Sequence, residues 1–275
     1  MSSTVHPSAL YRLPWTFTDN VLAWLEPTKK CNLYCEGCYS KNDPDSDKSI
    51  TEVRADLDVM VHNRKMDSVS IAGGDPLVHP EIVEIIKIIS NDYGLKPVIN
   101  TNGLALTEEL LSQLVDAGLY GFTFHIDSSQ GRPYWKNSNE LELCELRLKY
   151  AKMVKKAGDL SVAFNSTVFP DTLKYVPDLI EWSRKHIDIV HNMVFILFRT
   201  TRTDQFDYFA NGSLVDTKDL VYYDQDKNPE PLLAQNVIDE IRKVEPEFMP
   251  SAYLGGTKDP NSFKWLLSVR MGNSN

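Results

Sequence analysis

The stretch CNLYCEGCYS, residues 31–40, holds three of the chain's four cysteines within eight positions. It follows an apolar run, VLAWLEP from Val21, that is typical of a β-strand. It precedes SITEVRADLDVM, in which Ser49 and Glu52 form a predicted capping box at the start of an amphipathic helix. The cysteines are therefore expected on the loop of a strand–loop–helix unit. In a chain expected to be cytoplasmic, clustered thiols indicate metal or redox chemistry more readily than disulfides.

The same strand–loop–helix rhythm recurs along the chain to Arg199. Five further strands are predicted: DSVSIAGG, KPVINTNG, YGFTFHIDS, LSVAFNSTVF and IVHNMVFILFR. Helices are predicted between them, one opening with Pro80 at its first position, one from Thr107 to Gly118, and one capped by Asn139 and closed by Gly158. Units of roughly thirty residues are typical of βαβ crossovers, which give parallel strands with the helices outside. Periodicity alone leaves two folds open, a doubly wound sheet and a partial barrel.

Composition narrows the class of protein. The chain has 275 residues, of which 42% are hydrophobic and 24% charged, with a formal net charge of −9. The negative net charge argues against nucleic acid as a partner, because phosphate binding needs clustered Lys and Arg. We find no apolar run of transmembrane length and no signal-peptide pattern in MSSTVHPSALYRLPW, so we expect a cytoplasmic protein.

Three parts are expected along the chain. Residues 1–20 form an N-terminal extension, residues 21–199 the α/β domain, and residues 200–275 a largely irregular C-terminal extension with one helix around NVIDEIRKV. The last residues, SFKWLLSVRMGNSN, begin an apolar run that breaks off. We expect the natural protein to continue beyond Asn275, in which case 200–275 would be an incomplete substrate-binding region.

Every predicted strand ends in a polar or glycine-containing cluster. These clusters are Ala72-Gly73-Gly74-Asp75, Asn100-Thr101-Asn102-Gly103, His125-Ile126-Asp127-Ser128, Asn165-Ser166-Thr167 and Arg199, besides the cysteine segment. Ligands of parallel α/β folds bind at the carboxyl ends of the strands. Loops after strands are often polar in any case, but all six clusters beside a metal motif predict one shared site.

Cys31, Cys35 and Cys38 have the spacing C-x₃-C-x₂-C. A closed structural zinc site takes four protein ligands. The remaining cysteine, Cys144, lies in a predicted helix between leucines, where a buried thiol acts as a small hydrophobe. The loop therefore offers three thiolates and leaves one coordination position open. Soft thiolates suit zinc or an iron–sulfur cluster.

The cysteine segment resembles the signature of the radical S-adenosylmethionine (radical SAM) superfamily. Gly73-Gly74-Asp75-Pro76 is similar to the glycine-rich loop of that family, with Asp in place of the usual Glu. Thr101-Asn102-Gly103 resembles the T-N-G of the branch that includes molybdenum-cofactor biosynthesis, and His125-Ile126-Asp127-Ser128 resembles its S-x-D-S, with His replacing Ser. The resemblance covers about residues 20 to 200 and four motifs in order.

This resemblance implies a partial (β/α)₆ TIM-like barrel with parallel strands. It also implies that Cys31, Cys35 and Cys38 hold a [4Fe–4S] cluster whose free iron binds S-adenosylmethionine. Reduction by a partner such as flavodoxin or ferredoxin would cleave the cofactor, and the 5′-deoxyadenosyl radical would abstract hydrogen from a substrate. The cofactor-binding residues expected from the matching motifs and strand ends are Gly73, Gly74, Asp75, Thr101, Asn102, His125, Asp127, Asn165 and Ser166. In this view the two glycines let the backbone approach the methionine amine.

The substrate is expected to be a small molecule or a lipid. The long loop at residues 128–137 carries Arg132 and Tyr134, which together with Arg199 are substrate candidates, although each arginine is equally consistent with a solvated side chain. With only Cys144 to spare, a second cluster is not expected. Two alternatives remain: a methyltransferase or C–C bond former of the same superfamily, and a non-catalytic zinc- or iron-binding module.

Overall fold

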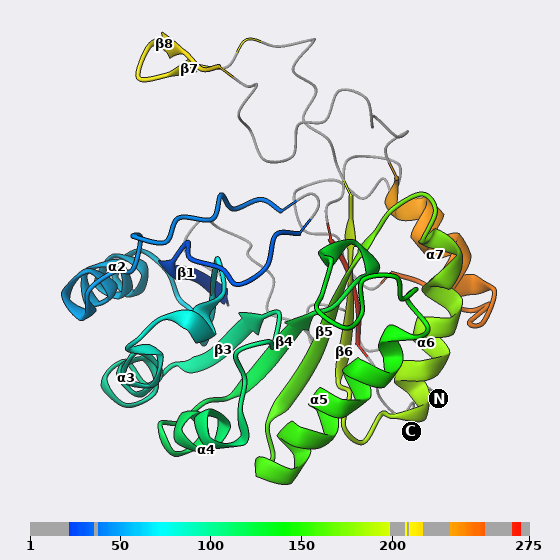
Figure 1. Ribbon diagram of the computed structural model, residues 1–275, viewed down its shortest axis with the longest axis horizontal. Helices are drawn as coiled ribbons and strands as arrows, with labels where there is room; N and C mark the ends of the chain where they lie inside the picture. The colour runs from blue at the N-terminus through cyan, green and yellow to red at the C-terminus, as the bar shows by residue number, and fades with distance from the viewer. Residues whose placement is uncertain are drawn as a thin grey trace, which may run out of the picture.

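The computed structural model describes residues 22–35, 38–198, 207, 209–216, 232–250 and 266–270. Its centre is a seven-stranded sheet in the order β1-β2-β3-β4-β5-β6-β9 (Figure 1). The strands are β1 (Leu22–Thr28), β2 (Ser68–Gly73), β3 (Lys96–Thr101), β4 (Gly121–His125), β5 (Ser161–Val168), β6 (Asn192–Leu197) and β9 (Leu266–Arg270). Strands β1 to β6 are parallel to their neighbours, and β9 runs antiparallel to β6.

Helices follow the strands in strict alternation and lie outside the curved sheet (Figure 1). They are α2 (Ile50–Asn63), α3 (Ile82–Lys87), α4 (Glu108–Asp116), α5 (Leu143–Ala157), α6 (Val176–Lys185) and α7 (Ala234–Arg242). The order confirms the predicted six-unit partial barrel. Among the described residues of the C-terminal part, α7 corresponds to the helix expected around NVIDEIRKV and packs on α6, and the run predicted only as apolar forms the edge strand β9. A small hairpin, β7 (Phe209–Ala210) with β8 (Ser213–Leu214), stands apart from the sheet.

Most helix ends follow the signals in the sequence. Ser49 and Glu52 form the predicted capping box, and the Thr107 hydroxyl accepts from the Leu110 amide. One start was wrong: the helix expected at Pro80 begins at Ile82. The ring of His79 accepts the amide hydrogen of Glu81, which adds a turn before the helix.

The two faces of the sheet differ in polarity. On the outer face, Phe124 stacks on Tyr150 of α5 with ring centroids 4.9 Å apart, and Phe164 meets Trp182 of α6 edge-on at 5.8 Å. On the inner face, β5 exposes every second residue partly. The polar residues of this inner face are Ser70, Asn100, Thr123, His125, Asn165, Thr167 and Asn192. The sheet therefore has an apolar core under its helices and a polar, partly accessible interior.

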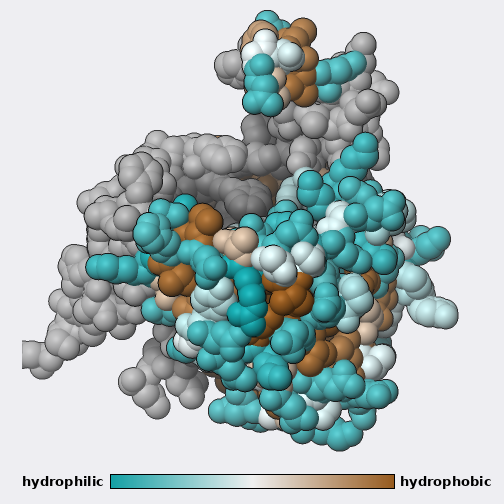
Figure 2. Space-filling model, turned by 90° about the vertical axis from the view of Figure 1, so that its left-hand side faces the viewer, coloured by the Kyte–Doolittle hydropathy of each residue, from teal (hydrophilic) through white to brown (hydrophobic). Residues whose placement is uncertain are grey.

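The described residues on the face shown in Figure 2 are mainly polar. On the side shown in Figure 2, hydrophilic side chains predominate among the coloured residues, and hydrophobic ones form separate patches between them. Within the described ranges, no helix has both the length and the apolar character needed to cross a membrane.

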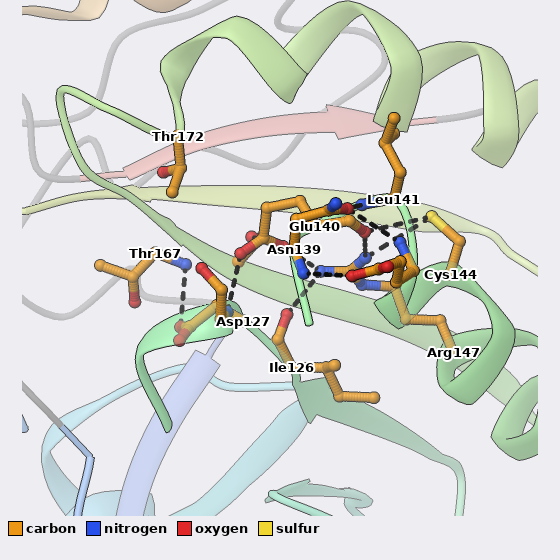
Figure 3. Close-up of polar contacts among 12 residues, drawn as sticks. Ile126, Asp127, Asn139, Glu140, Leu141, Cys144, Arg147, Thr167 and Thr172 are labelled. Atoms are coloured by element: carbon orange, nitrogen blue, oxygen red, sulfur yellow. Dashed lines mark hydrogen bonds and ion pairs between the residues drawn. The ribbon is translucent and has the colours of Figure 1, made fainter. Parts of the chain in front are cut away.

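A buried ion pair ties the tips of β4 and β5 to the start of α5 (Figure 3). The Nη2 of Arg147 donates to Glu140 Oε2 at 2.5 Å and to the Ile126 carbonyl at 2.7 Å. Glu140 also accepts from the Ser128 amide at 2.8 Å and from the Ser166 hydroxyl at 3.2 Å. Both charged side chains are buried, and a buried charge is tolerated only when it is paired and hydrogen-bonded.

We predict that Glu140→Ala lowers the free energy of unfolding by about 3–5 kcal/mol, because it leaves the Arg147 charge buried without its partner. Urea unfolding followed by circular dichroism measures the loss. Replacing both residues, Glu140→Gln with Arg147→Met, should cost clearly less than the single change. Equal losses in the two variants would contradict a stabilising role for the pair.

Candidate functional site

The cysteine loop is attached to the glycine-rich loop by backbone hydrogen bonds. Beyond the end of β1, the Gly74 amide donates to the Thr28 carbonyl at 2.9 Å, and the Asp75 amide donates to the Lys30 carbonyl at 2.8 Å. Cys31 is the next residue. The pairing of β1 with β2 therefore continues, through the glycine loop, to the residue before the first cysteine.

Two glycines are required by this close approach. A Cβ added to Gly73, whose φ is +111°, would lie 2.1 Å from the Thr28 carbonyl oxygen. A Cβ on Gly74 would lie 2.1 Å from the carbonyl oxygen of Lys30. The sequence-based explanation invoked room for a cofactor, but the chain's own backbone already excludes any side chain here.

Two side chains fix the cysteine loop further. The Asn42 side chain accepts from the Cys31 amide at 3.0 Å and donates to the Cys31 carbonyl at 2.9 Å. The Tyr39 hydroxyl donates to Glu26 Oε1 at 3.0 Å and accepts from the Gly73 amide at 3.2 Å. Both ends of the loop are thus held against the tips of β1 and β2.

The three loop thiols are free, partly buried and close enough to affect one another. Burial raises the pKa of Cys31 and Cys38. Burial, and then the negative charges of Asp127, Cys38 and Cys31, raise the pKa of Cys35 to about 12. In the described part of the chain, no three His, Cys, Asp or Glu side chains already enclose one point as a preformed cage. The three soft donors still fit an iron–sulfur cluster or zinc, because a bound cation would relieve the repulsion among their thiolate forms.

Asp75 joins the tips of β2 and β3. Its carboxylate is 1% exposed and accepts from the Thr101 hydroxyl, the Asn102 amide at 2.8 Å and the Leu77 amide at 3.0 Å. Burial raises the pKa of Asp75 despite these hydrogen bonds. Asp75 and Thr101, both expected near the cofactor, are therefore occupied in holding the two strand ends together.

Asn102 connects this junction to the cysteine loop. Its side-chain amide donates to Asn32 Oδ1 at 2.7 Å and lies 3.8 Å from Cys31 Sγ. Its carbonyl accepts from Arg132 Nη2 at 2.6 Å. Arg132 is 2% exposed, so it is not the solvated arginine that its sequence context allowed, and its role toward a substrate stays a prediction.

A second polar group lies at the tips of β4 and β5. The Nε2 of His125 is 2.8 Å from Asp127 Oδ2 and 3.0 Å from the Thr167 hydroxyl. Burial alone would raise the pKa of Asp127, but the hydrogen bond and charge of His125 and the hydrogen bonds of Thr167 hold it below its usual range. The ionised Asp127 therefore orients the half-exposed His125 on the inner face.

The other predicted residues fall in different places. Asn165 pairs with His125 across the β4–β5 ladder and lies on the inner face. Ser166 points to the helix side, where its hydroxyl donates to Glu140. Tyr134 is fully exposed with a φ of +68°, and Arg199 lies outside the described residues. Thr167 was missed, although its position two residues after Asn165 placed it on the same strand face.

Cys144 is separate from the loop thiols. It is 9% exposed on α5, and its thiol contacts the Glu140 carbonyl and the Arg147 guanidinium. The expected buried helix position is confirmed.

Comparison with known proteins identifies relatives. Residues 25–183 match the family model of the radical SAM superfamily. The chain is 28% identical to the AdoMet-dependent heme synthase of Methanosarcina barkeri over 70% of this chain and 54% of that protein. It is 26% identical to the probable GTP 3′,8-cyclase of Methanocaldococcus jannaschii over 70% and 63%. Its fold is similar to that of methylornithine synthase, with a TM-score of 0.52, 14% identity and coverage of 85% and 64%. The chain spans less than two thirds of each of these relatives.

We predict that Gly74→Ala separates the glycine loop from the cysteine loop, because the new methyl group collides with the Lys30 carbonyl. Overpacking of this kind costs about 1–3 kcal/mol. The amount of iron that each chain retains after anaerobic reconstitution should fall together with the stability. Gly158→Ala is the matched control, since a Cβ there meets nothing within 4 Å. Normal stability and iron content in Gly74→Ala would contradict this role.

We also predict that metal binding to the metal-free chain releases protons. All three thiols are protonated at neutral pH because their pKa values lie above the ordinary range, and they must ionise to bind metal. The affinity for Co²⁺ should therefore rise with pH, by up to about 1,000-fold per unit below pH 9. Cys35→Ser should reduce this dependence, and Cys144→Ser should leave it intact. A pH-independent affinity would show that the loop thiols are not the ligands.

Proposed function

The chain belongs to the radical SAM superfamily, and on this premise we propose that Cys31, Cys35 and Cys38 hold a [4Fe–4S] cluster at the carboxyl ends of the strands. The observation that carries the proposal is the loop itself. Three free thiols are held on a segment whose backbone is hydrogen-bonded to the glycine loop, and the remaining cysteine is packed elsewhere. Three ligands leave one iron available to S-adenosylmethionine.

When bound, the cluster would supply the electron that cleaves S-adenosylmethionine, giving a 5′-deoxyadenosyl radical that abstracts hydrogen from the substrate. The chain's residues have two kinds of role in this proposal. Asp75 and Thr101 hold the strand tips in register, whereas His125 and Asn165 present polar groups on the inner face for cofactor or substrate. Asp127 keeps the His125 ring in one orientation.

The inner face supports a small, polar substrate more than a lipid. Its residues include hydrogen-bonding side chains such as Asn100, Thr123 and Asn192 beside the apolar Val194 and Ile196, whereas the phenylalanines of these strands face the helices. An alkyl chain would leave such groups unpaired. We propose that the protein works in the cytoplasm with a flavodoxin- or ferredoxin-type reductant.

We predict that the anaerobically reconstituted protein is brown and, once reduced with dithionite, converts S-adenosylmethionine to 5′-deoxyadenosine. Cys31→Ala, Cys35→Ala and Cys38→Ala should each lower the rate at least about 100-fold, because an incomplete ligand set cannot hold the cluster. Cys144→Ala is the control and should retain activity. A metabolite extract that accelerates the reaction would contain the substrate, and the product would distinguish hydrogen abstraction from methyl transfer.

A colourless protein with one bound zinc and no 5′-deoxyadenosine would contradict the proposal. It would favour the non-catalytic metal-binding module instead.

A further inference from the structure

Arg132 is a buried cation that lacks a direct anionic partner. Its Nε donates to Gln130 Oε1 at 2.6 Å, and its Nη2 donates to the carbonyls of Asn102 at 2.6 Å and His125 at 2.7 Å. Its Nη1 is buried and makes no hydrogen bond of good geometry among the described residues, although the Tyr150 hydroxyl lies close to the guanidinium. Such an arrangement is costly, because a buried charge requires a compensating one.

The other buried arginine has a direct anionic partner. Arg147 is paired directly with Glu140. Around Arg132, across the described ranges, no carboxylate lies within ion-pair distance. The two nearby carboxylates are already engaged: Asp75 accepts from Thr101 and Asn102, and Asp127 is bound to His125. Both carboxylates act on Arg132 electrostatically without pairing with it, which leaves the place of a direct counter-charge to another group.

The cysteine loop lies in the right place to provide it. The carbonyl of Asn102 receives Nη2 of Arg132, and the side-chain amide of the same residue lies against Cys31 Sγ. Arg132 also acts electrostatically on Cys35, where its positive charge favours the thiolate. The guanidinium is thus linked to Cys31 through Asn102 and acts electrostatically on Cys35.

We propose that Arg132 is a positioning residue that balances the negative charge of the cluster and raises its reduction potential. This inference rests on the proposed function. A cluster gains negative charge when it is reduced, so a buried positive charge beside its ligands stabilises the reduced form. The unpartnered Nη1 provides a donor for a thiolate or sulfide sulfur, and the guanidinium is held in place by the strand-tip carbonyls.

The test is a redox titration of the reconstituted protein, followed by electron paramagnetic resonance in the absence of S-adenosylmethionine. Arg132→Gln should shift the reduction equilibrium at least tenfold toward the oxidised cluster, which is about 59 mV for a one-electron couple. Arg132→Lys retains the charge and should shift it less. The control, Glu140→Gln with Arg147→Met, removes a buried arginine whose charge acts on Cys144 and not on the loop thiols, and should leave the potential unchanged.

Gln130→Glu provides a second variant in case Arg132→Gln does not fold. This variant keeps the acceptor for Arg132 Nε but adds a carboxylate that neutralises the guanidinium. The reduction potential of the cluster should therefore fall, as in Arg132→Gln. A wild-type potential in the folded variants would overturn the inference. So would a loss of S-adenosylmethionine affinity alone, since the arginine would then serve the cofactor carboxylate. Failure of the wild-type protein to form any iron–sulfur cluster would overturn the proposed function as well.

Discussion

The short ladder between Thr28–Lys30 and Gly73–Asp75 is the constraint on which the site depends. It carries the pairing of β1 and β2 past the end of the regular strands and brings the first cysteine to the edge of the sheet. Only glycine fits at both positions, because the two backbones touch. Asp75 then extends the junction to β3, and Asn102 returns it to the cysteine loop. The cysteine loop is therefore held by the sheet, although its described residues form no helix or strand.

Much of the architecture could be predicted from the sequence because its signals are local. Alternating strand and helix patterns gave all six parallel units, and the capping residues Ser49 and Thr107 marked helix starts correctly. Among the described residues, hydrogen bonds join the polar clusters after β2 and β3 to each other, and likewise those of β4 and β5, as parallel topology favours. The helix near Pro80 was misplaced because a side-chain contact of His79, which no periodicity reveals, delayed its start.

The roles of individual polar residues could not be predicted in the same way, because they depend on distant partners. Asp75 was expected to bind the cofactor, and its carboxylate already accepts hydrogen bonds from the neighbouring strand end. Arg132 lies in a polar loop yet is buried, with its guanidinium on the carbonyls of Asn102 and His125. Ser166 was assigned to the interior, whereas strand alternation turns it to the helix side and leaves Asn165 and Thr167 inside. Alternate residues of a strand share one face, so the position of Ser166 relative to a residue known to face the helices would have placed it correctly.

The antiparallel strand β9 has a consequence for how the chain assembles. Each of the six parallel units pairs with the one made just before it, so the sheet can grow in order as the polypeptide is synthesised. Until β9 arrives from far along the chain, β6 presents a free edge of backbone donors and acceptors. Exposed edges of this kind recruit strands from other molecules and promote aggregation. Because β9 pairs with β6 after the other strands are made, it covers this edge last and protects the sheet from intermolecular pairing.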